Sequence, residues 1–154
     1  MFDQAVGCVF LVEDSKHDIA IFEYAARRMH FPITLRKHMS GTSALAEINS
    51  LHLLDDAQLP SLFILDIAIP DVNGVELCKR IKEVYAARGM ETPAIVFLTS
   101  RPTEEALKLS LTSPHIEVHE KPTRLSDYQN IFQAMFSLTL NTGRQGFEPM
   151  AASA

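Results

Sequence analysis

Residues 62–74 read LFILDIAIPDVNG. Four apolar residues, Leu62 to Leu65, run directly into Asp66, and a Pro-Asp-x-Asn-Gly turn follows. An unbroken apolar run bounded by turn residues predicts a strand of a parallel sheet, because such a strand is covered on both faces. Asp66 is then either an acid that merely faces water at the end of a strand or a reactive group.

Similar apolar runs recur along the chain and alternate with helical patterns. We predict further strands at residues 8–12, 33–37, 94–98 and 116–119, the second of them polar enough to lie near an edge. Helical stripes follow each strand, and Ser15 with Asp18 three positions later resembles a capping box at the start of the first helix. Five β-α units with right-handed crossovers predict a doubly wound, three-layer α/β domain.

The composition is that of an ordinary soluble domain. Of 154 residues, 47% are apolar and 21% charged, and the net charge of -5 argues against a nucleic-acid partner. No apolar run is long enough for a membrane span, and no signal peptide is visible, so we expect a cytoplasmic protein. Cys8 and Cys78 are expected to be free thiols. We predict one domain over residues 1–139 and a flexible tail over residues 140–154, which has no periodicity.

Polar side chains follow four of the five predicted strands in a way that suggests a site. Glu13 and Asp14 come after the first strand, Asp66 after the third, and Thr99 and Lys121 after the fourth and fifth. In an open α/β sheet, ligands bind at the carboxyl ends of the strands. Each residue alone could be an ordinary polar residue at a strand end, but their joint occurrence predicts that they form one site.

This set of groups suits a hard cation and a phosphoryl group. Three clustered carboxylates repel one another and need a compensating charge, which Mg²⁺ supplies through oxygen ligands. A carboxylate beside the cation can attack a phosphoryl group and form an aspartyl-phosphate. A lysine and a hydroxyl would stabilise the phosphoryl oxygens.

Four segments together resemble a known family. They are FLVEDS (10–15), LFILDIAIPDVNG (62–74), IVFLTS (95–100) and HEKPT (119–123). In this order they resemble the receiver domain of two-component response regulators, over about residues 8–136. The size is similar to that of stand-alone, chemotaxis-type members. The resemblance implies a flavodoxin-like fold with strand order 2-1-3-4-5.

The resemblance also implies a role for each matching residue. It casts Asp66 as the phosphoacceptor, Thr99 as the switch hydroxyl and Lys121 as the phosphate partner. The implied Mg²⁺ ligands are Glu13, Asp14, Asp66 and the backbone carbonyl of Ala68. A cis peptide bond before Pro122 is implied as well.

The chain departs from the family pattern at three positions. Val118 stands where the family often has a tyrosine or phenylalanine that turns inward on activation, and we interpret it as a plain strand valine. Ala68 and Arg101 occupy the two positions that tune dephosphorylation. Since Ala68 cannot orient an attacking water, we expect a moderately long-lived aspartyl-phosphate.

Two connections, residues 51–60 and 85–93, look longer than usual and resemble those of stand-alone receivers that serve phytochrome-type kinases. The implied partners are a sensor histidine kinase or histidine phosphotransfer protein and a downstream protein target, reached by protein–protein interaction or phosphorelay. A homodimer through the fourth and fifth helices stays open. No conventional turnover is expected beyond self-phosphorylation and slow autodephosphorylation.

Two alternative functions remain. One is a degenerate receiver that acts as a scaffold without phosphorylation, which the intact acid set disfavours. The other is a phosphohydrolase with an aspartyl nucleophile. The haloacid-dehalogenase type of that enzyme has a second aspartate two positions after the nucleophile, where this chain has Ala68.

Overall fold

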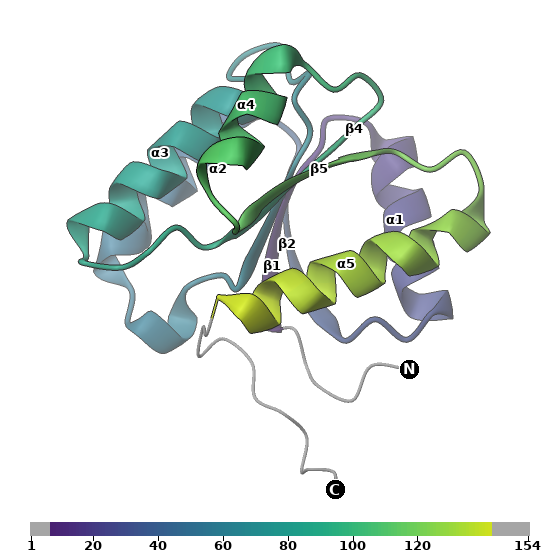
Figure 1. Cartoon of the computed structure of the whole chain (residues 1–154), viewed down its shortest axis with the longest axis horizontal. Coiled ribbons are helices and arrows are strands. Elements are labelled where there is room, and N and C mark those ends of the chain that lie inside the picture. The colour runs from purple at the N-terminus through teal and green to yellow at the C-terminus, as the bar shows by residue number, and fades with distance from the viewer. Residues whose placement is uncertain (1–6, 143–154) are drawn as a thin grey trace, which may run out of the picture.

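A computed structural model of the chain describes residues 7–142 (Figure 1). Strands and helices alternate throughout. In chain order they are β1 (Gly7–Val12), α1 (Lys16–Arg28), β2 (Ile33–His38), α2 (Gly41–Ser50), β3 (Leu62–Leu65), α3 (Gly74–Ala87), β4 (Ala94–Thr99), α4 (Glu104–Thr112), β5 (Ile116–Glu120) and α5 (Tyr128–Asn141). Short 3₁₀ turns are η1 (Leu51–Leu53), η2 (Asp56–Gln58) and η3 (Leu125–Asp127).

The five strands form one parallel sheet in the order β2-β1-β3-β4-β5. Every residue of β3 and β4 is buried, whereas β2 at one edge alternates between half-buried and exposed residues. Central strands are covered on both faces and therefore read as continuous apolar runs, while an edge strand need not. The predicted fold class, strand order and edge position of residues 33–37 are confirmed.

Two apolar cores lie on opposite faces of the sheet. Helices α2, α3 and α4 cover one face, and α1 and α5 cover the other (Figure 1). Phe10, Phe63 and Phe97 belong to the first core. Their sequence neighbours Leu11 and Ile64 belong to the second. Successive residues of a strand point to opposite faces of the sheet, so each central strand contributes side chains to both cores in turn.

The helix starts follow local capping chemistry. The side chains of Ser15, Ser40, Asn73 and Thr103 each accept a hydrogen bond from a backbone N–H in the first turn of α1, α2, α3 and α4. The last helix, α5, ends at Asn141. Most of the predicted tail of residues 140–154, from residue 143 on, lies outside the described residues.

The long connection of residues 51–60 is bonded to the second long connection, residues 85–93, through Arg88. The guanidinium group of Arg88, at the end of α3, donates to the carbonyl oxygens of Leu51 and Leu54 and to the carboxylate of Asp56. Gln58 and Asp55 add a local capping box around η2. The residues 51–58 are therefore ordered and packed against α3.

Two further observations bear on the sequence predictions. No helix of the described residues is long and apolar enough to cross a membrane. The expected cis bond before Pro122 is wrong, since residues 7–142 contain no cis peptide bond. The trans form is the lower-energy isomer of an X-Pro bond by about 0.5–1 kcal/mol.

Candidate functional site

The carboxyl ends of β1, β3, β4 and β5 bring together the polar residues predicted to form the site. Glu13 follows β1, Asp66 follows β3, Thr99 ends β4 and Lys121 follows β5. Backbone bonds join these ends, because Asp66 N–H donates to Val12 O and Lys121 N–H donates to Thr99 O. The position of each side chain is therefore set by the sheet itself.

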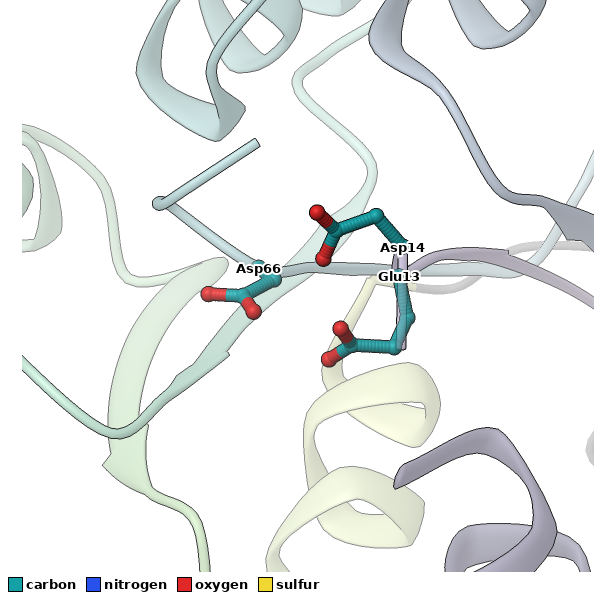
Figure 2. Close-up of side chains that lie close together, drawn as sticks. All are labelled: Glu13, Asp14 and Asp66. Carbon is teal, nitrogen blue, oxygen red and sulfur yellow. The ribbon is translucent and has the colours of Figure 1, made fainter. Parts of the chain in front are cut away.

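Three carboxylates meet at this edge. Oxygens of Glu13, Asp14 and Asp66 all lie within 4.8 Å of one another. Figure 2 shows the carboxylates of Glu13 and Asp14, the two acids that follow β1, directed toward Asp66. Glu13 and Asp66 are buried and Asp14 is exposed. Among residues 7–142, this is the group of side chains whose spacing suits a metal ion.

The ammonium group of Lys121 lies against two of these acids and a further one. Its Nζ is 2.5 Å from Glu13 Oε2, 2.9 Å from Asp66 Oδ2 and 2.7 Å from Asp18 Oδ2. The Lys121 side chain is 14% exposed, so these ion pairs are partly shielded from water. One lysine is thus shared by three carboxylates.

Burial and Lys121 act in opposite directions on the acids. Burial raises the pKa of Glu13 to about 7, although the hydrogen bond from Lys121 opposes the rise. Burial also disfavours the charged form of Asp66, but the hydrogen bond and charge of Lys121, together with hydrogen bonds from Ala68 and Thr99, outweigh it and hold the pKa of Asp66 below its ordinary value. A lowered pKa favours the ionised form of Asp66, which is the form that a nucleophile needs.

The loop after β3 is tightly fitted around Asp66. Ala68 N–H donates to Asp66 Oδ1 at 3.2 Å, and Gly74 N–H donates to Ile67 O. A Cβ on Gly74 would lie 2.4 Å from the carbonyl oxygen of Asp66, so only glycine allows α3 to begin this close to the strand end. The Asn-Gly turn of the opening stretch thereby places the start of α3 against Asp66.

Asp71 ties the same loop to a second helix. Its carboxylate accepts hydrogen bonds from Gly41 N–H at 3.0 Å, Thr42 N–H at 2.8 Å and the Thr42 hydroxyl at 2.7 Å, all at the start of α2. A Cβ on Gly41 would meet Val72 O at 2.1 Å, which shows how closely the two segments approach. The loop that carries Ala68 is therefore anchored at both ends.

Thr99 and Val118 lie as the sequence suggests. Thr99 is 1% exposed, its hydroxyl accepts from Arg101 N–H at 3.3 Å, and its hydrogen bonding contributes to the lowered pKa of Asp66. Val118 packs against the core under α2, α3 and α4. His119 points to the opposite face, where its ring nitrogen contacts Glu117 at 2.9 Å. These positions agree with our interpretation of Val118 as a plain strand residue.

One residue of this cluster was missed from the sequence. Asp18 was interpreted only as a helix-capping residue, yet its carboxylate contacts Lys121. A usable signal was the helical spacing, since the first turn of α1 begins directly after the acidic pair. His38, which follows the predicted second strand, does not join the cluster, because its ring contacts Ser43 and Glu47 of α2.

The comparison with protein families agrees with this geometry. The model of the response regulator receiver domain matches residues 9–132. The chain belongs to the response regulator receiver domain family. The receiver domain thus carries its acids, its hydroxyl and its lysine at one edge of the sheet, on the strand ends described above.

Individual relatives support the same assignment. The receiver domain is 27% identical over 114 residues to the transcriptional regulatory protein SpaR of Bacillus subtilis, and it spans only 44% of that relative's length. It is 26% identical to the phosphorylated cyanobacterial phytochrome response regulator RcpA, with a TM-score of 0.66, covering 88% of this chain and 95% of that one. The fold is shared by a two-component response regulator of Cytophaga hutchinsonii, which is 19% identical. The TM-score is 0.67, and the match covers 86% of this chain and 98% of that one.

Proposed function

We propose that this receiver domain accepts a phosphoryl group on Asp66 from a histidine kinase or a histidine phosphotransfer protein and signals through protein–protein contact or relay. The observation that carries the proposal is the position of Asp66. It is buried, it bonds Lys121 at 2.9 Å, and it lies within 4.8 Å of two further carboxylates. Protein–protein signalling also agrees with the net charge of -5, which disfavours direct nucleic-acid binding.

The donor set fits Mg²⁺. Glu13, Asp14 and Asp66 offer oxygen atoms only, at a spacing that one small cation can bridge, and the exposed Asp14 leaves room for waters. The backbone carbonyl of Ala68, on the anchored loop after β3, is the proposed fourth protein ligand. When bound, the cation offsets the negative charge of the carboxylates and of the incoming phosphoryl oxygens.

The residues of the chain divide the chemistry among them. A carboxylate oxygen of Asp66 attacks the phosphorus atom, a P–O bond forms, and the P–N bond to the donor histidine breaks. The bonding electrons stay on the donor nitrogen, which takes up a proton. Lys121 and the Thr99 hydroxyl are proposed to bind the phosphoryl oxygens, since both already lie beside Asp66.

The partner is expected to be a phytochrome-type sensor kinase. The similarity to RcpA, a phytochrome response regulator, supports this choice. The resemblance of the long connection after α2 to those of receivers that serve phytochrome-type kinases supports it as well. On phosphorylation, the surface formed by α4, β5 and α5 is expected to change and to bind the downstream target.

Phosphorylation by a small phosphodonor tests the proposal. The wild-type chain is incubated with acetyl phosphate, with and without Mg²⁺, and the adduct is mapped by mass spectrometry after acid quenching. We expect an acid-stable, base-labile adduct on Asp66 that requires Mg²⁺ and is lost in Asp66→Asn.

Glu105→Gln serves as the matched control, because it removes one exposed carboxylate that pairs with Lys79 on the surface between α3 and α4. It should label like the wild type. Labelling that survives in Asp66→Asn would refute the assignment of the phosphoacceptor. No labelling and no Mg²⁺ binding in the wild type would favour the scaffold function instead.

A further inference from the structure

Asp18 gives Lys121 a third carboxylate partner from outside the strand ends. It lies in the first turn of α1, and its Oδ2 is 2.7 Å from Lys121 Nζ, although the two residues are 103 positions apart in sequence. Its side chain is 34% exposed, whereas those of Glu13 and Asp66 are 6% and 8% exposed. Asp18 therefore approaches the lysine from the rim of the site.

The local chemistry of α1 does not account for this orientation. Ser15 caps the helix by accepting from Asp18 N–H at 3.2 Å, and a full capping box would have the Asp18 carboxylate accept from Ser15 N–H in return. That N–H donates to Glu13 Oε1 at 3.0 Å instead. Glu13 thus accepts the hydrogen bond from Ser15 N–H that Asp18 would accept in a capping box, and the Asp18 carboxylate contacts Lys121 instead.

The contact matters because Lys121 occupies the region between Glu13 and Asp66. These two acids also belong to the group of carboxylates whose spacing suits a cation. An ammonium group held only by Glu13 and Asp66 would compete with the cation for both of them. The carboxylate of Asp18, on the α1 side, gives Lys121 a partner outside this pair and offsets part of its charge.

We propose that Asp18 is a positioning residue for Lys121: it binds the ammonium group from the rim of the site, so that Lys121 keeps a carboxylate partner when the cation takes Glu13 and Asp66 and stays anchored once Asp66 carries a phosphoryl group. The inference rests on the proposed function, since it concerns the same site. Asp18 acts through Lys121 and needs no contact with the phosphoryl group itself.

The test is a double-mutant cycle on Mg²⁺ affinity. Mg²⁺ binding is titrated by calorimetry in the wild type, Asp18→Asn, Lys121→Met and the double variant. Asp18→Asn should weaken binding by roughly threefold or more, because Lys121 then has no other carboxylate to bind when the cation displaces it from Glu13 and Asp66. In the Lys121→Met background the same substitution should have a much smaller effect, since no ammonium group remains to be repositioned.

Two further measurements separate positioning from general loss of structure. At saturating Mg²⁺, Asp18→Asn should be phosphorylated by acetyl phosphate more slowly than the wild type, and Asp18→Glu should recover part of the rate. The ¹⁵N and ¹H shifts of the Lys121 ammonium group should change in Asp18→Asn but not in the surface control Glu105→Gln, which should also keep the wild-type Mg²⁺ affinity.

Equal effects of Asp18→Asn in both backgrounds would show that Asp18 contributes only its charge, and this would overturn the inference. Unchanged Mg²⁺ affinity and phosphorylation rate in Asp18→Asn would overturn it as well. A wild-type chain that neither binds Mg²⁺ nor accepts a phosphoryl group would instead refute the proposed function, so the two failures are distinguishable.

Discussion

Ala68 is the residue that most directly sets the expected lifetime of a phosphoryl group on Asp66. Its backbone N–H donates to Asp66 Oδ1, and its exposed side chain is a single methyl group. A methyl group cannot hydrogen-bond a water molecule and therefore cannot orient it for attack on the phosphorus. The proposed site is thus equipped to form an aspartyl-phosphate without a side chain at this position to hydrolyse it.

Replacing Ala68 by asparagine should accelerate loss of the phosphoryl group. The amide can hydrogen-bond the attacking water, and we expect release to be roughly 10- to 100-fold faster. The measurement is release of inorganic phosphate from the labelled chain after removal of the donor, with Mg²⁺ present. Complete release from the wild type within seconds, or identical rates in the two chains, would contradict the role given to Ala68.

At the scale of elements, the loop after β3 and the start of α2 behave as one unit. The carboxylate of Asp71 accepts two backbone hydrogen bonds and one hydroxyl hydrogen bond from Gly41 and Thr42. The Thr42 side chain and backbone, followed by the backbone of Gly41, hold the pKa of Asp71 well below its ordinary value. The ionised form of Asp71 is therefore the form that joins these two elements.

This contact predicts a pH dependence of stability. A carboxyl group with a depressed folded-state pKa stabilises the fold above its unfolded pKa, about 3.9, and loses that contribution as the pH falls toward the folded value. The difference in unfolding free energy between the wild type and Asp71→Asn should be constant above about pH 5 and should shrink below about pH 4.

Urea unfolding from pH 7 to pH 3 measures this difference. Glu104→Gln is the control, because it removes an exposed carboxylate of α4 that pairs only with its helix neighbour Lys108. It should differ little from the wild type at any pH in this range, as surface pairs contribute little. A difference between the wild type and Asp71→Asn that stays constant from pH 7 to pH 3 would contradict the anchoring role of the ionised Asp71.

At the scale of the whole molecule, the acid cluster places negative charge at the edge where the carboxyl ends of β1, β3, β4 and β5 meet. Burial raises the pKa of Glu13 to about 7, so ionised Glu13 lacks part of its solvation, and a bound cation would compensate for that loss. A ligand that binds the folded chain but not the unfolded chain stabilises the fold by mass action. The proposed cation should therefore raise the stability of the whole domain.

Mg²⁺ should increase the melting temperature in a saturable way. At a free concentration 100 times Kd, the stabilisation should be about 2.7 kcal/mol. Asp14→Asn, which removes the exposed member of the cluster, should lose most of this increment. The measurement is thermal unfolding with MgCl₂ against KCl at equal ionic strength. Equal effects of the two salts on the wild type would show that no specific site contributes.

Much of this domain could be predicted from the sequence because its signals are local. The apolar runs at 62–65 and 94–98 identified the central strands almost to the residue, since strands covered on both faces need continuous hydrophobicity. Ser15 indicated the start of α1, because a capping side chain bonds a backbone N–H within the first turn of its own helix. The cis bond assigned to Pro122 from the family resemblance was wrong, because an X-Pro isomer depends on the surrounding contacts.

The sequence by itself determined that Asp66 follows a buried strand and that acids, a hydroxyl and a lysine follow its neighbours, because parallel strands bring their carboxyl ends to one edge. Only the tertiary structure decided which partners these groups have. Asp18 reaches Lys121 across 103 positions, and Asp71 reaches the start of α2. Such contacts depend on how a helix packs against the sheet and on how two distant segments meet. The hydrophobic periodicity of the sequence predicts neither of these arrangements.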